Sequence, residues 1–170
     1  SAGAGAIPTF ETLPVGGITE ADMFRLSADL SGDGNPISSN LERVDDATFG
    51  KIGTGVSESS GIFTFATTGL YKITFFVSMQ MDANSDGSMT FSIQGTANNS
   101  SYDDLTEGCL SGDTNNNQNQ TASTSTFFNC TNVSTHKVRF KVASMNSNNT
   151  KGSSTETKTG FQFIRLGDSV

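Results

Sequence analysis

The chain has 170 residues, of which 34% are hydrophobic, and its formal net charge is -7. A domain of this length buries roughly 70% of the surface that its unfolded chain exposes, so one core is expected. The negative charge repels phosphate backbones and anionic membrane surfaces, which excludes nucleic acid as a partner. No stretch approaches the ~20 apolar residues of a membrane-spanning helix, so we expect no membrane insertion. The abundance of Gly, Ser, Thr and Asn favours strands and turns.

Residues 1–17 are rich in Gly and Ala, are interrupted by Pro, and show neither the strand period nor the helix period. We interpret them as an extended arm or linker that precedes one domain over residues 18–170. The apolar residues of the arm are spaced irregularly, like anchors along a strand laid on another protein. They are Ile7, Phe10, Leu13 and Val15. The arm is therefore expected to be an attachment device, and whether residue 1 is a natural start or a cut from a longer fibre stays open.

From Met23 onward, short alternating runs are separated by turn clusters at fairly regular intervals, which is typical of a β-sandwich or barrel. The expected strands cover residues 23–30, 62–65, 71–81, 89–94, 124–130, 136–142 and 160–166. Residues 50–55 contain closely spaced glycines that match no phosphate-binding pattern, so we expect a bulged or looped segment there. The domain is predicted to be all-β.

The clearest strand covers residues 71–81, where apolar and polar side chains alternate and one face is expected to be buried. Phe76 breaks the pattern because it places an aromatic ring on the polar face. Contact with another subunit explains an apolar side chain at such a position, and Phe76 is our candidate subunit contact. A second small core under a loop is the alternative explanation.

The connections after this strand are predicted from turn residues and composition. Asp86 and Gly87 supply the backbone freedom of a hairpin turn before the next alternating run, so a β-meander is expected over residues 71–94. Residues 96–122 are dominated by Asn, Ser, Gly and Gln, a composition that buries too little apolar area to form a core of its own. We therefore expect a long surface loop over residues 96–122.

The predicted hairpin turn also contains half of a calcium-binding pattern. Asp82, Asn84 and Asp86 supply alternate oxygens of the kind that surround a hard cation. The second half of the pattern is missing, because Ile93 stands where a bidentate Glu is required. A polar hairpin tip is the preferred interpretation and a calcium site is the alternative. No other cofactor is expected.

The strand expected over residues 136–142 combines an apolar and a cationic face. His136, the only histidine, alternates with apolar residues, so a packed or interface position is favoured over a role as general base. Lys137, Arg139 and Lys141 occupy the other positions, and we expect them to form a solvated face that guards against stray strand pairing.

The sequence offers little that resembles a catalytic centre. It has no Gly-x-Ser-x-Gly elbow and no Cys/His cluster with metal-ligand spacing. Two pairs of adjacent acids are the one catalytic arrangement that remains open, although adjacent acids in turns are usually solvated. They are Asp45-Asp46 and Asp103-Asp104. We expect no enzymatic activity, with a glycan hydrolase as the least favoured alternative. Cys109 and Cys130 form either a disulfide or two free thiols, and both options stay open.

Two segments together resemble a known fold family. Residues 60–71 read SGIFTFATTGLY and residues 159–164 read TGFQFI. In order and spacing they resemble the C1q/TNF-like jelly-roll family, which carries a Gly-x-Phe-Thr strand, a glycine turn and a Gly-x-Tyr strand start. The matching positions are Gly61, Phe63, Thr64, Gly69 and Tyr71. The likeness covers about residues 24–166, and it implies a ten-stranded sandwich that forms a tight homotrimer.

A second resemblance concerns the type of protein. Residues 21–26 (ADMFRL), 37–45 (ISSNLERVD) and 49–55 (FGKIGTG), followed by SSGIF at 59–63, look like virion proteins of marine tailed bacteriophages. Those include head decorations and the C-terminal domains of tail fibres. The chain has no collagen-like Gly-X-Y stem, so immune or cytokine activity is not implied.

These resemblances imply a trimeric structural protein on the virion surface, attached to other virion proteins by the arm. The alternative is a receptor-binding tip in which the loop expected over residues 96–122 contacts host glycans. The sequence has two Tyr and no Trp, so it offers few aromatic platforms for stacking sugars, which disfavours this alternative.

Overall fold

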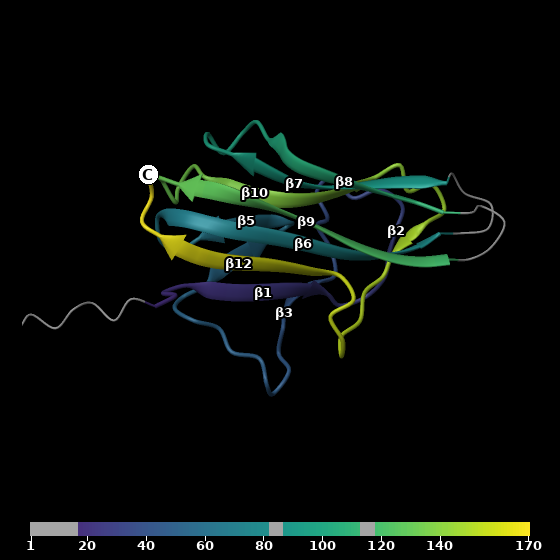
Figure 1. Cartoon of the computed structure of the whole chain (residues 1–170), viewed down its shortest axis with the longest axis horizontal. Coiled ribbons are helices and arrows are strands. Elements are labelled where there is room, and N and C mark those ends of the chain that lie inside the picture. The colour runs from purple at the N-terminus through teal and green to yellow at the C-terminus, as the bar shows by residue number, and fades with distance from the viewer. Residues whose placement is uncertain (1–16, 82–86, 113–117) are drawn as a thin grey trace, which may run out of the picture.

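The computed structural model describes residues 17–81, 87–112 and 118–170, which form two stacked antiparallel β-sheets (Figure 1). The strands are β1 (Ala21–Leu26), β2 (Leu30–Ser31), β3 (Leu41–Arg43), β4 (Val56–Ser59), β5 (Ile62–Phe65), β6 (Gly69–Met81), β7 (Ser88–Thr96), β8 (Asp103–Ser111), β9 (Gln118–Cys130), β10 (Lys137–Ala143), β11 (Asn149–Thr150) and β12 (Gly160–Gly167). The all-β prediction is confirmed. The part of the chain that the structure describes contains no helix able to span a membrane.

The long strand β6 is central to the seven-stranded sheet. One edge of β6 pairs with β9 along its whole length, and the other edge pairs with β12 and then with β11. Beyond β12 lie β1 and β3, and β2 pairs with β11. The five-stranded sheet has the order β4-β5-β10-β7-β8. In Figure 1 the five-stranded sheet contributes β7, β8 and β10 to the upper layer, and β1 and β12 lie in the lower one.

Aromatic side chains from both sheets fill the space between the layers. Phe63 of β5 is fully buried, and its ring lies 5.2 Å from Phe24 of β1, 5.3 Å from Phe140 of β10 and 5.1 Å from Phe163 of β12, centroid to centroid. Each of these side chains contributes about 1.5–3 kcal/mol through burial, and paired rings add to this. The alternation seen in the sequence therefore places one set of residues in a common core.

Most expected strands are confirmed, but the predicted meander is wrong. The strands expected over residues 71–81 and 89–94 exist as β6 and β7, yet they belong to different sheets. Alternation reports which side of a strand is buried, and it carries no information on which strand lies beside it. β6 and β7 are thus consecutive in the chain but belong to different sheets. The expected strand at 23–30 is split into β1 and β2.

The loop expected over residues 96–122 is also wrong, because most of it is strand. β8 occupies Asp103–Ser111 and pairs with β7, and β9 begins at Gln118 and pairs with β6. Both strands lie at the edges of their sheets, and their described side chains between residues 103 and 122 are half-buried or exposed, so they need no core of their own. Hydrogen bonds to a neighbouring strand and the β-branched Thr residues favour the extended conformation there.

The prediction that β10 has a solvated cationic face is wrong, because its three cationic side chains contact neighbouring residues. Lys137 is buried and its Nζ donates to the carbonyl oxygen of Val133 at 2.7 Å. Arg139 lies over the ring of Tyr102, 4.1 Å from its centroid. Lys141 pairs with Asp104, with Nζ and Oδ2 2.6 Å apart. These partners lie in neighbouring strands and turns, so the sequence of β10 itself does not reveal them.

Candidate assembly surface

The outer face of the seven-stranded sheet carries a row of side chains from four strands and a neighbouring loop, all of them apolar except Lys72 of β6. Phe127 of β9 lies opposite Lys72 of β6, which lies opposite Ile164 of β12, which in turn lies opposite Ala21 of β1. An isolated bridge adds Ile52 beside Ala21. Directly opposed residues project to the same side of a sheet, so these five side chains share one face.

Several of these side chains are strongly exposed. The exposed fraction is 66% for Phe127 and 45% for Ile52, whereas Ile164 is half-buried. Single exposed apolar residues are normal, but several apolar side chains gathered on one face mark an interaction site. On β6 and β9 the neighbouring row is small and polar, with Thr74 opposite Ser125. The face therefore offers an apolar row beside a low hydroxyl-bearing surface.

A hollow of about 160 Å³ opens at the β1 end of the apolar row. Its walls come from β1, β12 and the loop that carries Phe49. The lining residues are Ala21, Asp22, Met23, Phe49, Gly50, Gln162 and Ile164. We call it the Met23 hollow. Its walls are mostly apolar and it opens to solvent, so it is a site that another apolar group can fill.

Phe76, the candidate subunit contact, lies on this same outer face and is half-buried. A Cβ atom at the opposite residue, Gly160, would come within 2.3 Å of Phe76 Cζ and 2.8 Å of Thr157 Cγ2, so the ring lies directly over the glycine backbone. Glycine at this position lets the tip of the aromatic ring approach the backbone of β12. The ring thus packs locally on β12 and remains partly exposed to solvent. Its role as a contact between subunits stays a prediction.

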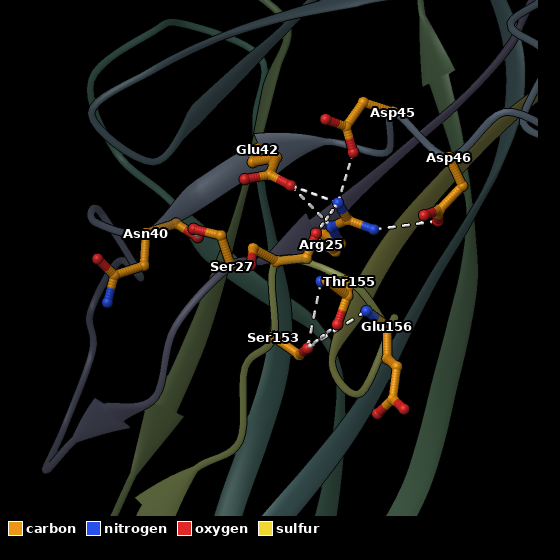
Figure 2. A network of polar contacts seen from close by, with 10 residues as sticks. Arg25, Ser27, Asn40, Glu42, Asp45, Asp46, Ser153, Thr155 and Glu156 are labelled. Atoms are coloured by element: carbon orange, nitrogen blue, oxygen red, sulfur yellow. Dashed lines mark hydrogen bonds and ion pairs between the residues drawn. The ribbon is translucent and has the colours of Figure 1, made fainter.

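Arg25 forms the centre of a charged cluster on the outer face (Figure 2). Its side chain has no exposed surface, although it lies on the outward side of β1 opposite Gly160. The guanidinium contacts Glu42 at 2.6 Å, Asp45 at 2.5 Å and Asp46 at 3.0 Å. It also donates to the carbonyl oxygen of Ser154. Two loops are therefore held over this part of the sheet.

The electrostatics of this cluster keep the arginine charged. Burial alone would lower the pKa of Arg25, but the hydrogen bond and charge of Glu42, with the charges of Asp46 and Asp45, raise it. Asp45 and Asp46, which are adjacent in the sequence, are thus both ion-pair partners of Arg25. In the second pair, Asp104 accepts hydrogen bonds from Lys141 and Gln94. The sequence left two acid pairs open as a catalytic arrangement. Each pair includes a carboxylate that forms an ion pair or a hydrogen bond with a neighbouring side chain.

The remaining predicted positions have structural surroundings. Gly55 donates its backbone N–H to the buried Glu20 at 2.6 Å, which confirms a looped segment at residues 50–55. His136 is half-buried, contacts Thr131 and Thr135 through its ring nitrogens, and lies with its ring 6.0 Å from that of Phe128. This is the packed position that the sequence favoured.

The two cysteines are free thiols, so the disulfide alternative is not realised. Cys109 is exposed on β8, whereas Cys130 is buried at the end of β9, and burial raises the pKa of the Cys130 thiol. In the described part of the chain, no three His, Cys, Asp or Glu side chains are grouped as a metal site would require.

Some predicted site residues fall outside the described part of the chain. They are the calcium candidates Asp82, Asn84 and Asp86, and the arm residues Ile7, Phe10, Leu13 and Val15. Their roles stay predictions. The sequence prediction also missed Phe127, although a signal was present. Phe127 and Phe128 are adjacent within a strand, so one ring must project outward, as with Phe75 and Phe76.

Comparison with known proteins shows likeness in structure alone. No protein-family model and no curated protein matches the sequence. Eiger TNF from S. frugiperda superposes with a TM-score of 0.64 at 11% identity, covering 88% of this chain and 94% of that one. Murine APRIL at pH 5.0 superposes with a TM-score of 0.62 at 12% identity, covering 86% and 98%. The fold is a TNF-like jelly roll.

Proposed function

We propose that the protein is a non-catalytic assembly module that forms a homotrimer through the outer face of the seven-stranded sheet. The observation that carries the proposal is the apolar row with Phe127, which is 66% exposed. Each Å² of apolar surface removed from water contributes about 25 cal/mol, which offsets the entropy that the subunits lose on association. A second copy is the partner we propose, because the C1q/TNF-like resemblance implies homotrimers.

We further propose that this trimer is a structural component on the surface of a tailed-phage virion, as a head decoration or a fibre component. The support is the sequence likeness of residues 21–26, 37–45 and 49–55 to marine phage virion proteins. Attachment to other virion proteins is assigned to the arm at residues 1–17. The glycan-binding alternative depended on a long loop over residues 96–122. Most of this segment belongs to β8 and β9, so the alternative loses its main support.

Sedimentation velocity and native mass spectrometry of the full chain at micromolar concentration test the assembly. A trimer is expected, and a stable monomer would contradict the proposal. Phe127→Asp is expected to weaken the trimer, since it places a charge in an apolar contact. The matched control is Ser57→Asp, which adds the same charge at an exposed position of β4 in the other sheet. This control should remain trimeric.

The virion role is tested by locating the chain in an electron-microscopy map of the particle. Density for three copies around a local threefold axis on the head or on a fibre is expected. Its position separates head decoration from fibre component. Absence of the chain from purified particles would contradict a virion role while leaving the trimer itself untouched.

A further inference from the structure

Phe127 has the shape of a knob on the outer face. It is 66% exposed and its strand neighbour in the ladder is the exposed Lys72. Phe128, the next residue, points into the core, where its ring stacks on Phe65 at 5.4 Å between centroids. The orientation of Phe127 is therefore set by the anchored ring beside it, and the knob is held in place on a paired strand.

The Met23 hollow has the size of a hole for such a ring. Its volume of about 160 Å³ is comparable with the ~150 Å³ apolar cavity that accommodates benzene in another protein. Its lining includes Phe49 from the loop, Met23 from β1 and Ile164 from β12. The Phe49 backbone N–H donates to the carbonyl oxygen of Asp46 at 2.8 Å, which ties this wall to the Arg25 cluster.

The knob and the hole cannot meet within one chain. Both open on the same face, and Phe127 on β9 is separated from Ala21 on β1 by β6 and β12. Three strand spacings amount to about 14 Å, and Lys72 stands between them. A ring that fills this hollow has to come from another molecule.

The charges around the two features are complementary. In the cluster beside the hollow, one guanidinium faces three carboxylates, which leaves two negative charges in excess. Asp45 has 75% of its side chain exposed, so part of this charge is presented at the surface. The cation of Lys72 stands beside the knob, in the ladder position between Phe127 and Ile164, and forms no ion pair with any residue that the structure describes. Opposite charges at the rims favour docking of knob into hole.

We infer that Phe127 of one copy inserts into the Met23 hollow of the next copy, with Lys72 brought toward Asp45 and Asp46. Knob and hole lie at different places on the chain, so the contact is head-to-tail. Such a contact closes into a ring when each copy is rotated by a third of a turn relative to the last. The inference rests on the proposed homotrimer and assigns its contacting residues.

Site-specific photocrosslinking tests the contact in the full-length protein. p-Benzoyl-phenylalanine at position 127 keeps an aromatic ring at the knob and inserts into neighbouring C–H bonds on irradiation. We expect intermolecular adducts on peptides that contain Met23, Phe49 or Ile164, identified by mass spectrometry. Adducts of residue 127 with residue 127 of another copy, or the absence of intermolecular adducts, would overturn the inference.

A mixing experiment tests the head-to-tail arrangement. Phe127→Asp removes the knob, and Ala21→Phe fills the hole from within. Each variant alone should be a folded monomer with a cooperative melting transition, whereas a 1:1 mixture retains one intact contact and should form dimers that do not extend to trimers. Trimers in either variant alone, or a mixture that stays monomeric, would overturn the inference. A monomeric wild type instead contradicts the proposed homotrimer, so the two failures are distinguishable.

Discussion

The outer faces of the two sheets differ in how their side chains are satisfied. On the five-stranded sheet, Asp104 binds both Lys141 and Gln94, and Gln94 in turn accepts a hydrogen bond from Arg139 at 2.6 Å. Arg139 also covers the ring of Tyr102. On the seven-stranded sheet, Phe127 and Ile52 project from the row with 66% and 45% of their surface exposed. One face is complete within the monomer, and the other is suited to a partner.

The difference follows from the chemistry of the two surfaces. Hydrogen-bonded ion pairs on a strand surface satisfy one another and leave little to gain from association. Apolar side chains form no hydrogen bonds with water, and they contribute to stability only when another surface removes them from water. The Arg25 cluster is an intermediate case, because it lies on the seven-stranded sheet but is closed over by two loops of its own chain.

The largest effect is expected at the Arg25 cluster. Arg25→Ala removes the cation that holds Glu42, Asp45 and Asp46, and hydrogen bonds to charged groups contribute about 1.5–3 kcal/mol. We expect a loss of unfolding free energy in this range, because the carboxylates are partly exposed and regain water. Urea denaturation measures it. The control Lys158→Ala removes the exposed ion pair between Lys158 and Glu156, whose charged atoms lie 3.9 Å apart. It should change the free energy of unfolding by less than about 1 kcal/mol. Equal losses in both variants would contradict a clamping role.

A smaller effect on the monomer is expected at Phe76. Full burial of a Phe contributes about 1.5–3 kcal/mol, so the half-buried ring on Gly160 should contribute roughly half of that. Phe76→Asp should lower stability accordingly and weaken the trimer, because a charge would be desolvated in an apolar contact. Thermal melting and sedimentation measure the two effects, with Phe76→Leu as the apolar control. If Phe76→Asp remains trimeric with unchanged melting, the residue is not at the interface.

The polar network of the five-stranded sheet should contribute less. A double-mutant cycle of Lys141→Ala and Asp104→Asn is expected to give a coupling energy of about 0.2–1 kcal/mol. Burial alone would raise the pKa of Asp104, but hydrogen bonds from Lys141 and Gln94 lower it. The stabilisation is therefore present above the unfolded pKa of about 3.9 and is lost as the pH falls through the folded value. Asp104→Asn should remove this part of the acid sensitivity, and a coupling energy that is the same at pH 7 and pH 2 would contradict the assignment.

The smallest effect on stability is expected from the arm. Ordering a free segment costs about 1–2 kcal/mol per residue, so the arm becomes fixed only where a partner supplies burial. Deletion of residues 1–17 should leave the melting temperature of the trimer nearly unchanged and abolish incorporation into particles. A control deletion that retains Ile7, Phe10, Leu13 and Val15 by removing only residues 1–5 should still be incorporated. Unfolding of the domain after the full deletion would show that the arm belongs to the core.

Much of the fold could be predicted from the sequence because strand periodicity is local. Alternation along β6, β7 and β12 identifies the side chains that face the core, and the Gly61 to Tyr71 pattern points to the jelly roll. The candidate site was predicted only in part. Phe76 interrupts a long alternating run and is visible at once, whereas Phe127 lies in the short strand expected over residues 124–130, where the sequence does not show what lies beside its outward face.

What the sequence by itself determined is therefore the inward and outward side of each strong strand, since successive side chains point to opposite faces in any strand. Only the tertiary structure decided which strands are neighbours. β6 pairs with β9 and β12 instead of β7, and this register places Phe127, Lys72, Ile164 and Ala21 in one row. Such a row joins residues far apart in the chain, because hydrogen bonding between strands, and not sequence proximity, brings their side chains to a common face.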